Sequence, residues 1–271
     1  MAEWENCSQS EVLDVRQSDS LRWLQLARPK ALNAFDEALQ AELRDAIDAA
    51  AADTTVRCVV LGGAGRAFSA GADIDLDNVA EGVRLAPRTE NELRMHYNPI
   101  IRALRRMPKP VVAAVNGPAV GAGCSLALAC DQVIASRSAS FTMGFAQVGL
   151  TLDAGASLLL GARIGLGRAA RMAFTAEPVG ADTALTWGMV DEVVDDEQLA
   201  ERVIELASGL AAGPTRAFAA IKHGLNVALL PTLDAVLEYE VCAQTRLVDS
   251  ADFREGVNAF ANRRKPSFTG S

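Results

Sequence analysis

The sequence predicts an α/β body followed by an all-helical C-terminal section. Up to about residue 195, short apolar runs closed by glycine, typical of buried strands, alternate with stretches in which apolar residues recur every three or four positions. Beyond that point only the helical spacing continues. Half of the 271 residues are hydrophobic, which is enough to bury a sizeable core. We therefore divide the chain into a body, residues 1–195, and a helical section, residues 196–271.

The body begins with two alternating apolar and polar runs, residues 12–16 and 21–27, which predict a β-hairpin. A helix is expected from Asp36, because leucines and an isoleucine recur there at every fourth position. The remaining predicted elements of the body are strands at residues 56–61, 111–115 and 132–135, a short helix at 125–129 and a helix after Asp153. The tail predicts one helix marked by Leu199, Val203, Leu206 and Leu210, and three more at roughly 214–229, 232–247 and 251–262.

Composition and charge exclude several classes of function. The formal net charge is −8, whereas nucleic acids and anionic membranes are held by dense Lys/Arg surfaces. Five scattered cysteines without a Cys-x-x-Cys pair disfavour a disulfide framework and a zinc site, and suit a reducing compartment. The N-terminus lacks an apolar signal segment, and no run approaches the roughly 20 apolar residues that span a bilayer. We expect a cytoplasmic protein with neither a nucleic-acid nor a membrane partner.

Two glycine-rich loops are candidate ligand sites. They are residues 67–73, Ala-Phe-Ser-Ala-Gly-Ala-Asp, and residues 116–123, Asn-Gly-Pro-Ala-Val-Gly-Ala-Gly, and each follows an expected strand and precedes an expected helix. Small side chains let backbone N–H groups approach a ligand, and two such groups aimed at one oxygen make an oxyanion hole. Tight packing between strand and helix explains the same glycines equally well. A phosphate loop is excluded, because neither Gly-Lys-Ser/Thr nor Gly-x-Gly-x-x-Gly occurs in them.

These loops belong to a set of motifs that resembles the enoyl-CoA hydratase/isomerase (crotonase) family. The resemblance runs from about residue 12 to the C-terminus, with several motifs in the family's order. The motifs are residues 28–35 (Arg-Pro-Lys-Ala-Leu-Asn-Ala-Phe), 67–74 (the first loop and an isoleucine), 108–123 (Pro-Lys-Pro-Val-Val-Ala-Ala-Val and the second loop), 126–131 (Leu-Ala-Leu-Ala-Cys-Asp) and 186–193 (Thr-Trp-Gly-Met-Val-Asp-Glu-Val).

The resemblance implies a crotonase-like body of ββα spiral turns, a helical C-terminal section that trimerises and an acyl-CoA thioester as substrate. It implies a homotrimer or a dimer of trimers, and no metal or cofactor other than the coenzyme A of the substrate. By position, the backbone N–H groups of Ala72 and Ala122 would form the oxyanion hole. Further loop residues would line the thioester site, namely Ala70, Gly71, Asp73 and Gly121.

Both glutamates that hydratases of this family use are absent. One would stand at Ser125 and the other, counted without gaps, at Phe145; a lone serine is not a base near neutral pH and phenylalanine cannot be one. Asp153 follows in an otherwise apolar stretch. That stretch is similar to the branch of the family that isomerises ring epoxides or unsaturated acyl-CoAs in phenylacetate-type catabolism, and residues 250–260 and 264–270 resemble it too. In that branch an aspartate at this position moves a proton.

One carboxylate is sufficient to shift a double bond. A base removes the C2 proton of a 3-enoyl thioester, the oxyanion hole holds the enolate, and the same acid returns a proton at C4. An apolar wall that includes Phe145 and Leu152 would raise the pKa of Asp153 and help it to hold the proton between the steps. The local sequence also has a second interpretation, because an aspartate before Ala-Gly-Ala-Ser-Leu-Leu-Leu is a good helix N-cap. The two roles are compatible.

The predicted function is therefore that of an acyl-CoA isomerase, with two alternatives. Asp153 could instead be the nucleophile of a hydrolase or dehalogenase, for which His96 is the candidate partner because His223 lies in the helical tail. The chain could also be a non-catalytic acyl-CoA-binding protein that has lost both glutamates.

The remaining candidates concern cations and motif residues. The phosphates of coenzyme A require nearby cations, for which Lys30 and Lys265 are the candidates. A basic cluster is explained equally well as the solvated face of a helix; its members are Arg102, Arg105, Arg106 and Lys109. We expect a packing role for the Cys124 thiol. The motif acids Asp73 and Asp131 are expected to make local hydrogen bonds.

Overall fold

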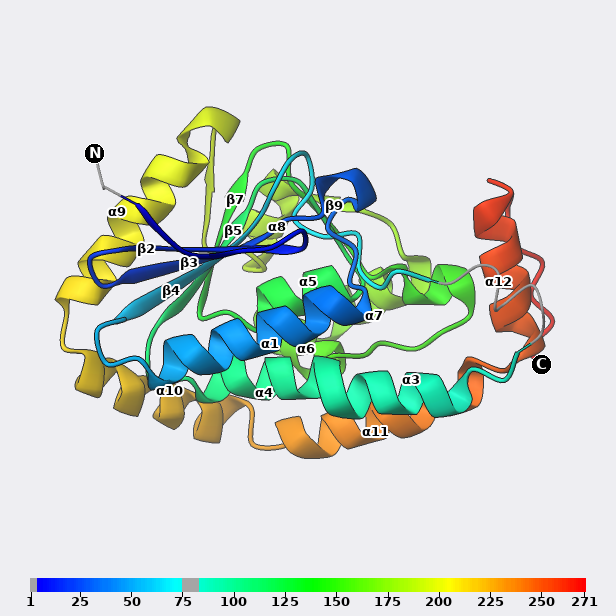
Figure 1. The fold of residues 1–271 in the computed structure, drawn as a ribbon. Coiled ribbons are helices and arrows are strands. Elements are labelled where there is room, and N and C mark those ends of the chain that lie inside the picture. Colours follow the sequence, from blue (N-terminus) through cyan, green and yellow to red (C-terminus); the bar gives the residue numbers. More distant parts are fainter. Residues whose placement is uncertain (1–3, 75–82) are drawn as a thin grey trace.

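The computed structural model describes residues 4–74 and 83–271, and it confirms the α/β class (Figure 1). Within those residues a seven-stranded sheet has the order β1-β2-β3-β4-β5-β7-β10, and a second sheet has the order β6-β8-β9. The first three strands are antiparallel neighbours, whereas all neighbours from β3 to β10 run parallel. The described strands are β1 (Glu5–Gln9), β2 (Leu13–Ser18), β3 (Leu21–Leu26), β4 (Cys58–Gly63), β5 (Val111–Val115), β6 (Pro118–Val120), β7 (Gln132–Ser136), β8 (Ser140–Thr142), β9 (Val179–Gly180) and β10 (Glu192–Val194).

Helices connect the strands and make up the C-terminal part. The described helices are α1 (Glu37–Ala52), α3 (Ala86–Glu92), α4 (Asn98–Arg106), α5 (Ala122–Leu128), α6 (Ala156–Ile164), α7 (Leu166–Thr175), α8 (Ala181–Trp187), α9 (Leu199–Ala212), α10 (Thr215–Leu229), α11 (Leu233–Leu247) and α12 (Ala251–Ala261). Four shorter turns are η1 (Pro29–Ala31), η2 (Leu93–Tyr97), η3 (Gly144–Val148) and η4 (Asp196–Gln198).

Most of the predicted elements are confirmed, and the differences have local causes. β1 was not expected, because all five of its residues are exposed and lack the alternation that marks a strand. β6 lies inside the second glycine loop, where three residues pair with β8. α5 begins at Ala122, three residues before the predicted helix, because its first turn is made of small residues without a helical pattern. The helix expected directly after Asp73 lies outside the described residues.

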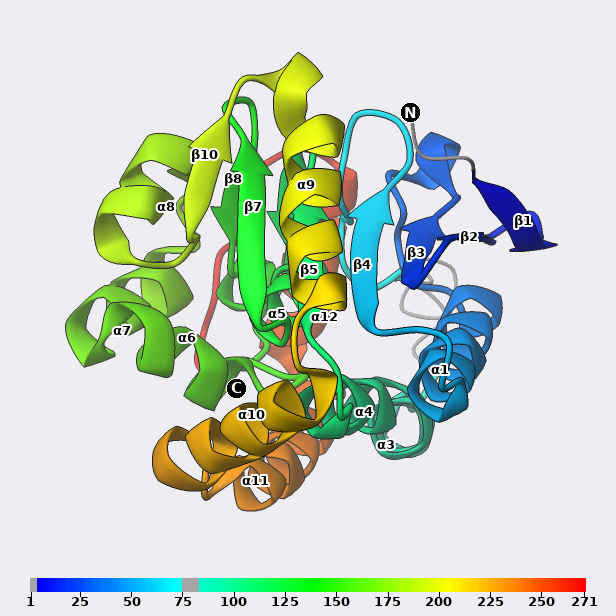
Figure 2. The same ribbon diagram turned by 90° about the vertical axis from the view of Figure 1, so that its left-hand side faces the viewer.

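The C-terminal helices pack against the body. α9 crosses one face of the sheet (Figure 2), where Leu199, Val203 and Ala207 are buried with Val60 and Val112 of the central strands. α10 contacts α4, and α11 contacts both α3 and α6 (Figure 1). α11 therefore reaches the helix that directly follows Asp153. The division of the chain at residue 195 stays a prediction.

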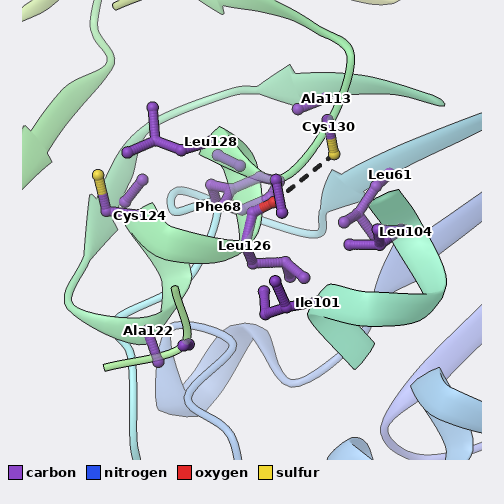
Figure 3. Close-up of a cluster of buried hydrophobic side chains, with 14 of the residues drawn as sticks. Leu61, Phe68, Ile101, Leu104, Ala113, Ala122, Cys124, Leu126, Leu128 and Cys130 are labelled. Carbon is purple, nitrogen blue, oxygen red and sulfur yellow. Dashed lines mark hydrogen bonds between the residues drawn. The ribbon is translucent and has the colours of Figure 1, made fainter. Parts of the chain in front are cut away.

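α5 is embedded in the main hydrophobic core. Figure 3 shows its leucines and Cys124 among side chains of β4, α4 and the first glycine loop. Burial raises the pKa of the Cys124 thiol to about 12, as expected for a packing role. A Cβ added to Gly123 would lie 2.6 Å from the Cβ of Ser69, so only glycine allows this close contact. For Gly123, then, tight packing is a sufficient explanation.

Only half of the basic cluster forms the solvated helix face that was one of its two interpretations. Arg105 and Lys109 are 9% and 6% exposed. Arg105 donates to Asp131 over 3.0 Å, so Asp131 makes the local contact expected of it, and Lys109 donates to carbonyls at the C-terminal end of α1. Arg102 and Arg106 lie at the surface, where both bind Asp234 of α11. Arg105 and Lys109 thus form hydrogen bonds that hold elements of the body together.

Candidate active site

The two glycine loops lie side by side. Ser69 of the first loop forms a parallel bridge with Ala119 of the second, and Ala72 forms one with Phe35. Phe35 donates its N–H to the carbonyl of Gly71 over 2.8 Å and accepts from the N–H of the residue after Ala72 over 3.1 Å. These bonds use the peptide groups on either side of Ala72, so the N–H of Ala72 itself points away from Phe35.

Glycine precedes both Ala72 and Ala122, and the two loops touch at the first of these glycines. Gly71 and Gly121 have φ values of +88° and +52°, a region that residues with side chains rarely adopt. A Cβ at Gly71 would lie 3.5 Å from the nitrogen of Ala122, which places the two loops in contact there. Ala122 is the first residue of α5, where N–H groups have no partner within the helix. Among residues 4–74 and 83–271, no acceptor binds either N–H.

Asp153 lies between η3 and α6, and its carboxylate does not cap the helix. α6 begins at Ala156 after Gly155 in the N-cap position, and only the backbone carbonyl of Asp153 bonds to this helix, over 3.0 Å. The N–H groups of Gly155 and Ser157 are bound instead by Glu240 of α11, over 2.7 and 2.9 Å. The N-cap interpretation of Asp153 is therefore wrong, because a remote carboxylate takes the place of a local cap.

Asp153 is half-buried, and one oxygen of its carboxylate is buried and unused. Its Oδ2 accepts from Nε2 of Gln244 over 2.9 Å, whereas Oδ1 is buried without a partner among the described residues. Burial raises the pKa of Asp153 to about 7, the charge of Glu240 adds to the rise, and the bond from Gln244 opposes it. A carboxyl group with this pKa is able both to accept and to release a proton near neutral pH.

Ser125 connects Asp153 to the glycine loops. Its side chain is buried in the first turn of α5, three residues after Ala122, and its hydroxyl lies 3.2 Å from the backbone oxygen of Asp153. The same hydroxyl lies 3.2 Å from the carbonyl of Gly121. The position that holds a glutamate in hydratases thus contacts the backbone of Asp153 here. This bond joins the backbone of Asp153 to the first turn of α5, which begins at Ala122.

A cavity of about 310 Å³ adjoins Ala72. Its lining residues are Phe35, Asp36, Glu37, Gln40, Ala72, Asp73, Arg88, Glu92 and Tyr97. The ring of Tyr97 packs edge-on against Phe35, with ring centres 5.8 Å apart. The Tyr97 hydroxyl and Gln40 Oε1 are buried without a hydrogen-bond partner in the described part of the chain. This wall therefore offers unused polar groups to whatever enters the cavity.

Tyr97 also interacts electrostatically with Asp153. Burial raises the pKa of the Tyr97 hydroxyl well above its usual value, and the charge of Asp153 is the next largest cause. Sequence reasoning missed Tyr97, Gln40, Glu240 and Gln244. Only Tyr97 left a signal, as an aromatic residue in the charged segment before the second glycine loop.

Two predicted apolar wall residues lie near the loops. Phe145 is buried, and its ring lies 3.7 Å from the point that a Cβ of Gly121 would occupy. Leu152 is half-buried and packs against the main core. The rise in the pKa of Asp153 by burial has the direction expected from such surroundings.

The other predicted site residues are two members of the first glycine loop and two lysines. Asp73 lines the cavity and binds Arg28 over 3.0 Å, which is the local contact expected of it. The N–H of Ala70 donates to a carbonyl of the first motif over 2.9 Å. Lys30 and Lys265 are exposed, and neither lines the cavity. Their role toward coenzyme A stays a prediction.

His96 does not join the site in the described structure. It is half-buried in η2, does not line the cavity, and its side chain makes no hydrogen bond to any described residue. The described residues also contain no group of three or more histidine, cysteine or acidic side chains that could hold a metal ion. No described helix is long and apolar enough to span a membrane.

Comparison with known proteins identifies the family. Residues 16–271 match the family model described as enoyl-CoA hydratase/isomerase. The chain is 44% identical to the 1,2-epoxyphenylacetyl-CoA isomerase of Escherichia coli (strain K12), over 91% of this chain and 94% of the relative. It is 43% identical to a protein of Rhodobacter capsulatus named "Probable enoyl-CoA hydratase", over 93% and 96% of the two chains.

A solved structure agrees with the sequence relatives. The crystal structure of an enoyl-CoA hydratase from Mycobacterium avium subsp. paratuberculosis K-10 superimposes with a TM-score of 0.85 at 39% identity, and covers 97% of this chain and 100% of that one. These matches confirm the crotonase-like fold and the resemblance carried by the motifs. The chain belongs to the enoyl-CoA hydratase/isomerase family of enzymes.

Proposed function

We propose that the chain is an acyl-CoA isomerase that uses Asp153 as its proton shuttle and the N–H groups of Ala72 and Ala122 as its oxyanion hole. The observation that carries this proposal is the state of Asp153. Its carboxyl group has a pKa raised to about 7 and a buried oxygen, Oδ1, without a partner among the described residues, and its backbone oxygen accepts from Ser125 in the turn that begins with Ala122. The relative from Escherichia coli is named an isomerase of a ring-epoxide CoA thioester, so this substrate class stands beside the 3-enoyl-CoAs.

The geometry suits enolate chemistry with one acid–base group. Asp153 takes the C2 proton, and the electron pair moves into the thioester, where Ala72 and Ala122 stabilise the oxyanion. The enolate collapses as Asp153 delivers a proton to C4, which forms the C2–C3 double bond and returns the carboxylate. Each oxyanion donor is worth about 2.7–4 kcal/mol in other enzymes. No water molecule needs activation, which agrees with Ser125 and Phe145 standing where hydratases carry glutamate.

The alternatives receive less support. A hydrolase or dehalogenase needs a partner that activates water, and the side chain of His96 makes no hydrogen bond to Asp153 or to any other described residue. A non-catalytic acyl-CoA-binding protein would have no need for a buried carboxyl group with a free oxygen, which costs stability when it ionises.

Incubation with a 3-enoyl-CoA in heavy water tests the proposal. We expect conjugated 2-enoyl-CoA as product and deuterium at C2 of the recovered substrate, followed by NMR and mass spectrometry. Ligand binding with neither product nor exchange would favour the non-catalytic protein. A single turnover in oxygen-18 water tests the hydrolase or dehalogenase alternative, because only a nucleophilic Asp153 would acquire the label.

Tyr97→Phe should change substrate preference. The hydroxyl makes no hydrogen bond of normal geometry among the described residues, although Gln40 lies close enough to lower its pKa. An acyl group with an acceptor oxygen near the ring would gain a hydrogen bond from it. For such a substrate we expect kcat/KM to fall about 3- to 10-fold. For a hydrocarbon acyl chain it should stay equal or rise, because an unpaired buried hydroxyl is removed. Tyr239→Phe, at a tyrosine that is 65% exposed, is the matched control. An equal loss for both substrates would contradict a role in selectivity.

The setting of the reaction is proposed from the resemblance. Lys30 and Lys265 are candidates for the CoA phosphates, no cofactor is required beyond the coenzyme A of the substrate, and the enzyme would work in the cytoplasm as a homotrimer or a dimer of trimers. Exposed apolar side chains on α10 support self-association; they are Ile221, Leu225, Val227 and Leu229.

A further inference from the structure

Two buried polar side chains of α11 reach the aspartate across more than 80 residues of sequence. Glu240 and Gln244 are four positions apart, so they project from the same face of the helix. They are 1% and 2% exposed. Buried polar groups of this kind are retained where their hydrogen bonds are used, and both residues spend them on the segment 151–157 around Asp153.

Gln244 fixes one oxygen of Asp153. Its Oε1 accepts from the N–H of Thr151 over 3.1 Å, and its Nε2 donates to Oδ2 of Asp153 over 2.9 Å. A backbone N–H can only donate and a carboxylate can only accept, so the amide has one orientation that satisfies both neighbours. The bond holds Oδ2 and leaves Oδ1 without a hydrogen-bond partner among the described residues.

Glu240 fixes the chain on the other side of Asp153. Its two oxygens accept from the N–H groups of Gly155 and Ser157, the first amides of α6. Gly155 has φ +79° and no side chain with which to cap the helix, so α6 starts where Glu240 holds it. The positive end of α6 and the two N–H groups favour the charged form of Glu240, although burial raises its pKa.

We propose that Glu240 and Gln244 form an α11 clamp that positions the carboxyl group of Asp153 for proton transfer, with Oδ2 held and Oδ1 free. The proposal rests on the proposed role of Asp153 as shuttle. Glu240 and Gln244 are positioning residues, since both act on the substrate only through Asp153. The C-terminal helical section then completes the active site of the body.

The two halves of the clamp act on the proton affinity of Asp153 in opposite directions. Gln244 donates to the carboxylate and favours its charged form, whereas the negative charge of Glu240 disfavours it. The other titratable group that faces Asp153 is Tyr97 of η2, which is itself influenced by Glu92 and Asp73. Opposite shifts show that both residues act on the carboxyl group, and the split between kcat and KM separates positioning from a merely structural role.

The clamp is tested with Gln244→Met, Glu240→Gln and, as control, Glu238→Gln on the exposed side of the same helix. The pKa of Asp153 is read from its infrared carboxyl band, identified by subtracting the spectrum of Asp153→Asn in each background. We expect Gln244→Met to raise this pKa and Glu240→Gln to lower it. We also expect kcat for isomerisation to fall about 10- to 100-fold in both, with KM nearly constant, because misplacement of a catalytic group acts on the chemical step. Glu238→Gln should match the wild type.

Shifts in the same direction, or unchanged titration and kcat, would overturn the clamp. Glu240→Gln leaves one helix amide without an acceptor; if this variant does not fold, Gln244→Met alone still decides between a raised and an unchanged pKa. The infrared titration does not depend on turnover. If the wild type shows no isomerisation, the proposed function fails, while the titration still shows whether α11 controls Asp153.

Discussion

Asp153→Asn is expected to lower kcat for isomerisation by about 10²–10⁴-fold while the Kd for acyl-CoA changes little. Asparagine has nearly the same shape and can keep the bond from Gln244 through its carbonyl oxygen, but it cannot take the C2 proton. Exchange of the C2 proton with heavy water measures the lost step directly, and isothermal calorimetry measures binding. Asp234→Asn, at an exposed aspartate of α11, is the matched control. Wild-type exchange in Asp153→Asn would remove Asp153 from the mechanism.

The same substitution should have a pH-dependent effect on stability. The pKa of Asp153 rises from its usual 3.8 to about 7 on folding, so the folded state binds more protons than the unfolded state between these values. Stability therefore falls as pH rises through this window, by up to about 4 kcal/mol at pH 8. We expect Asp153→Asn to be more stable than the wild type at pH 8 and to lose this advantage below pH 4, as followed by urea unfolding.

In the wild type, kcat/KM should rise with pH through about 7, because the free enzyme needs the ionised base.

Gly71→Ala is the second substitution with a large expected effect. A Cβ there would lie 2.7 Å from the carbonyl oxygen of Val120, and the φ of +88° is unfavourable for alanine. The two loops must move apart, so the N–H groups of Ala72 and Ala122 would no longer converge. We expect kcat to fall about 10²–10³-fold, as on loss of an oxyanion donor, and stability to fall by about 1–3 kcal/mol.

The control for this prediction is Gly161→Ala in α6, where an added Cβ meets no atom within 4 Å. This variant should keep full activity and be slightly more stable, since alanine favours a helix over glycine. Steady-state kinetics and thermal unfolding distinguish the outcomes. A Gly71→Ala protein with reduced stability but unchanged kcat would show that the loops support the fold and not the oxyanion.

Local patterns account for what sequence reasoning found of the fold. β4, β5 and β7 are buried at almost every residue and therefore read as continuous apolar runs, whereas α9 buries one face and shows the four-residue spacing of a helix. β1 left no such trace, because it is an exposed edge strand. Asp153 could also be found from local sequence, because it is the one ionisable residue in an otherwise apolar stretch.

The sequence by itself determined the α/β class, the positions of the glycine loops, the missing glutamates and the single aspartate. Only the tertiary structure decided that Glu240, and not Asp153, caps α6, that Gln244 holds one oxygen of Asp153, and that Tyr97 faces the cavity. The physical reason is that periodicity reports whether a residue is buried along its own helix or strand. Periodicity does not report which distant element covers a residue. The sequence pattern of a helix is the same whether its glutamate or glutamine contacts water or, as Glu240 does, a buried amide 85 residues away.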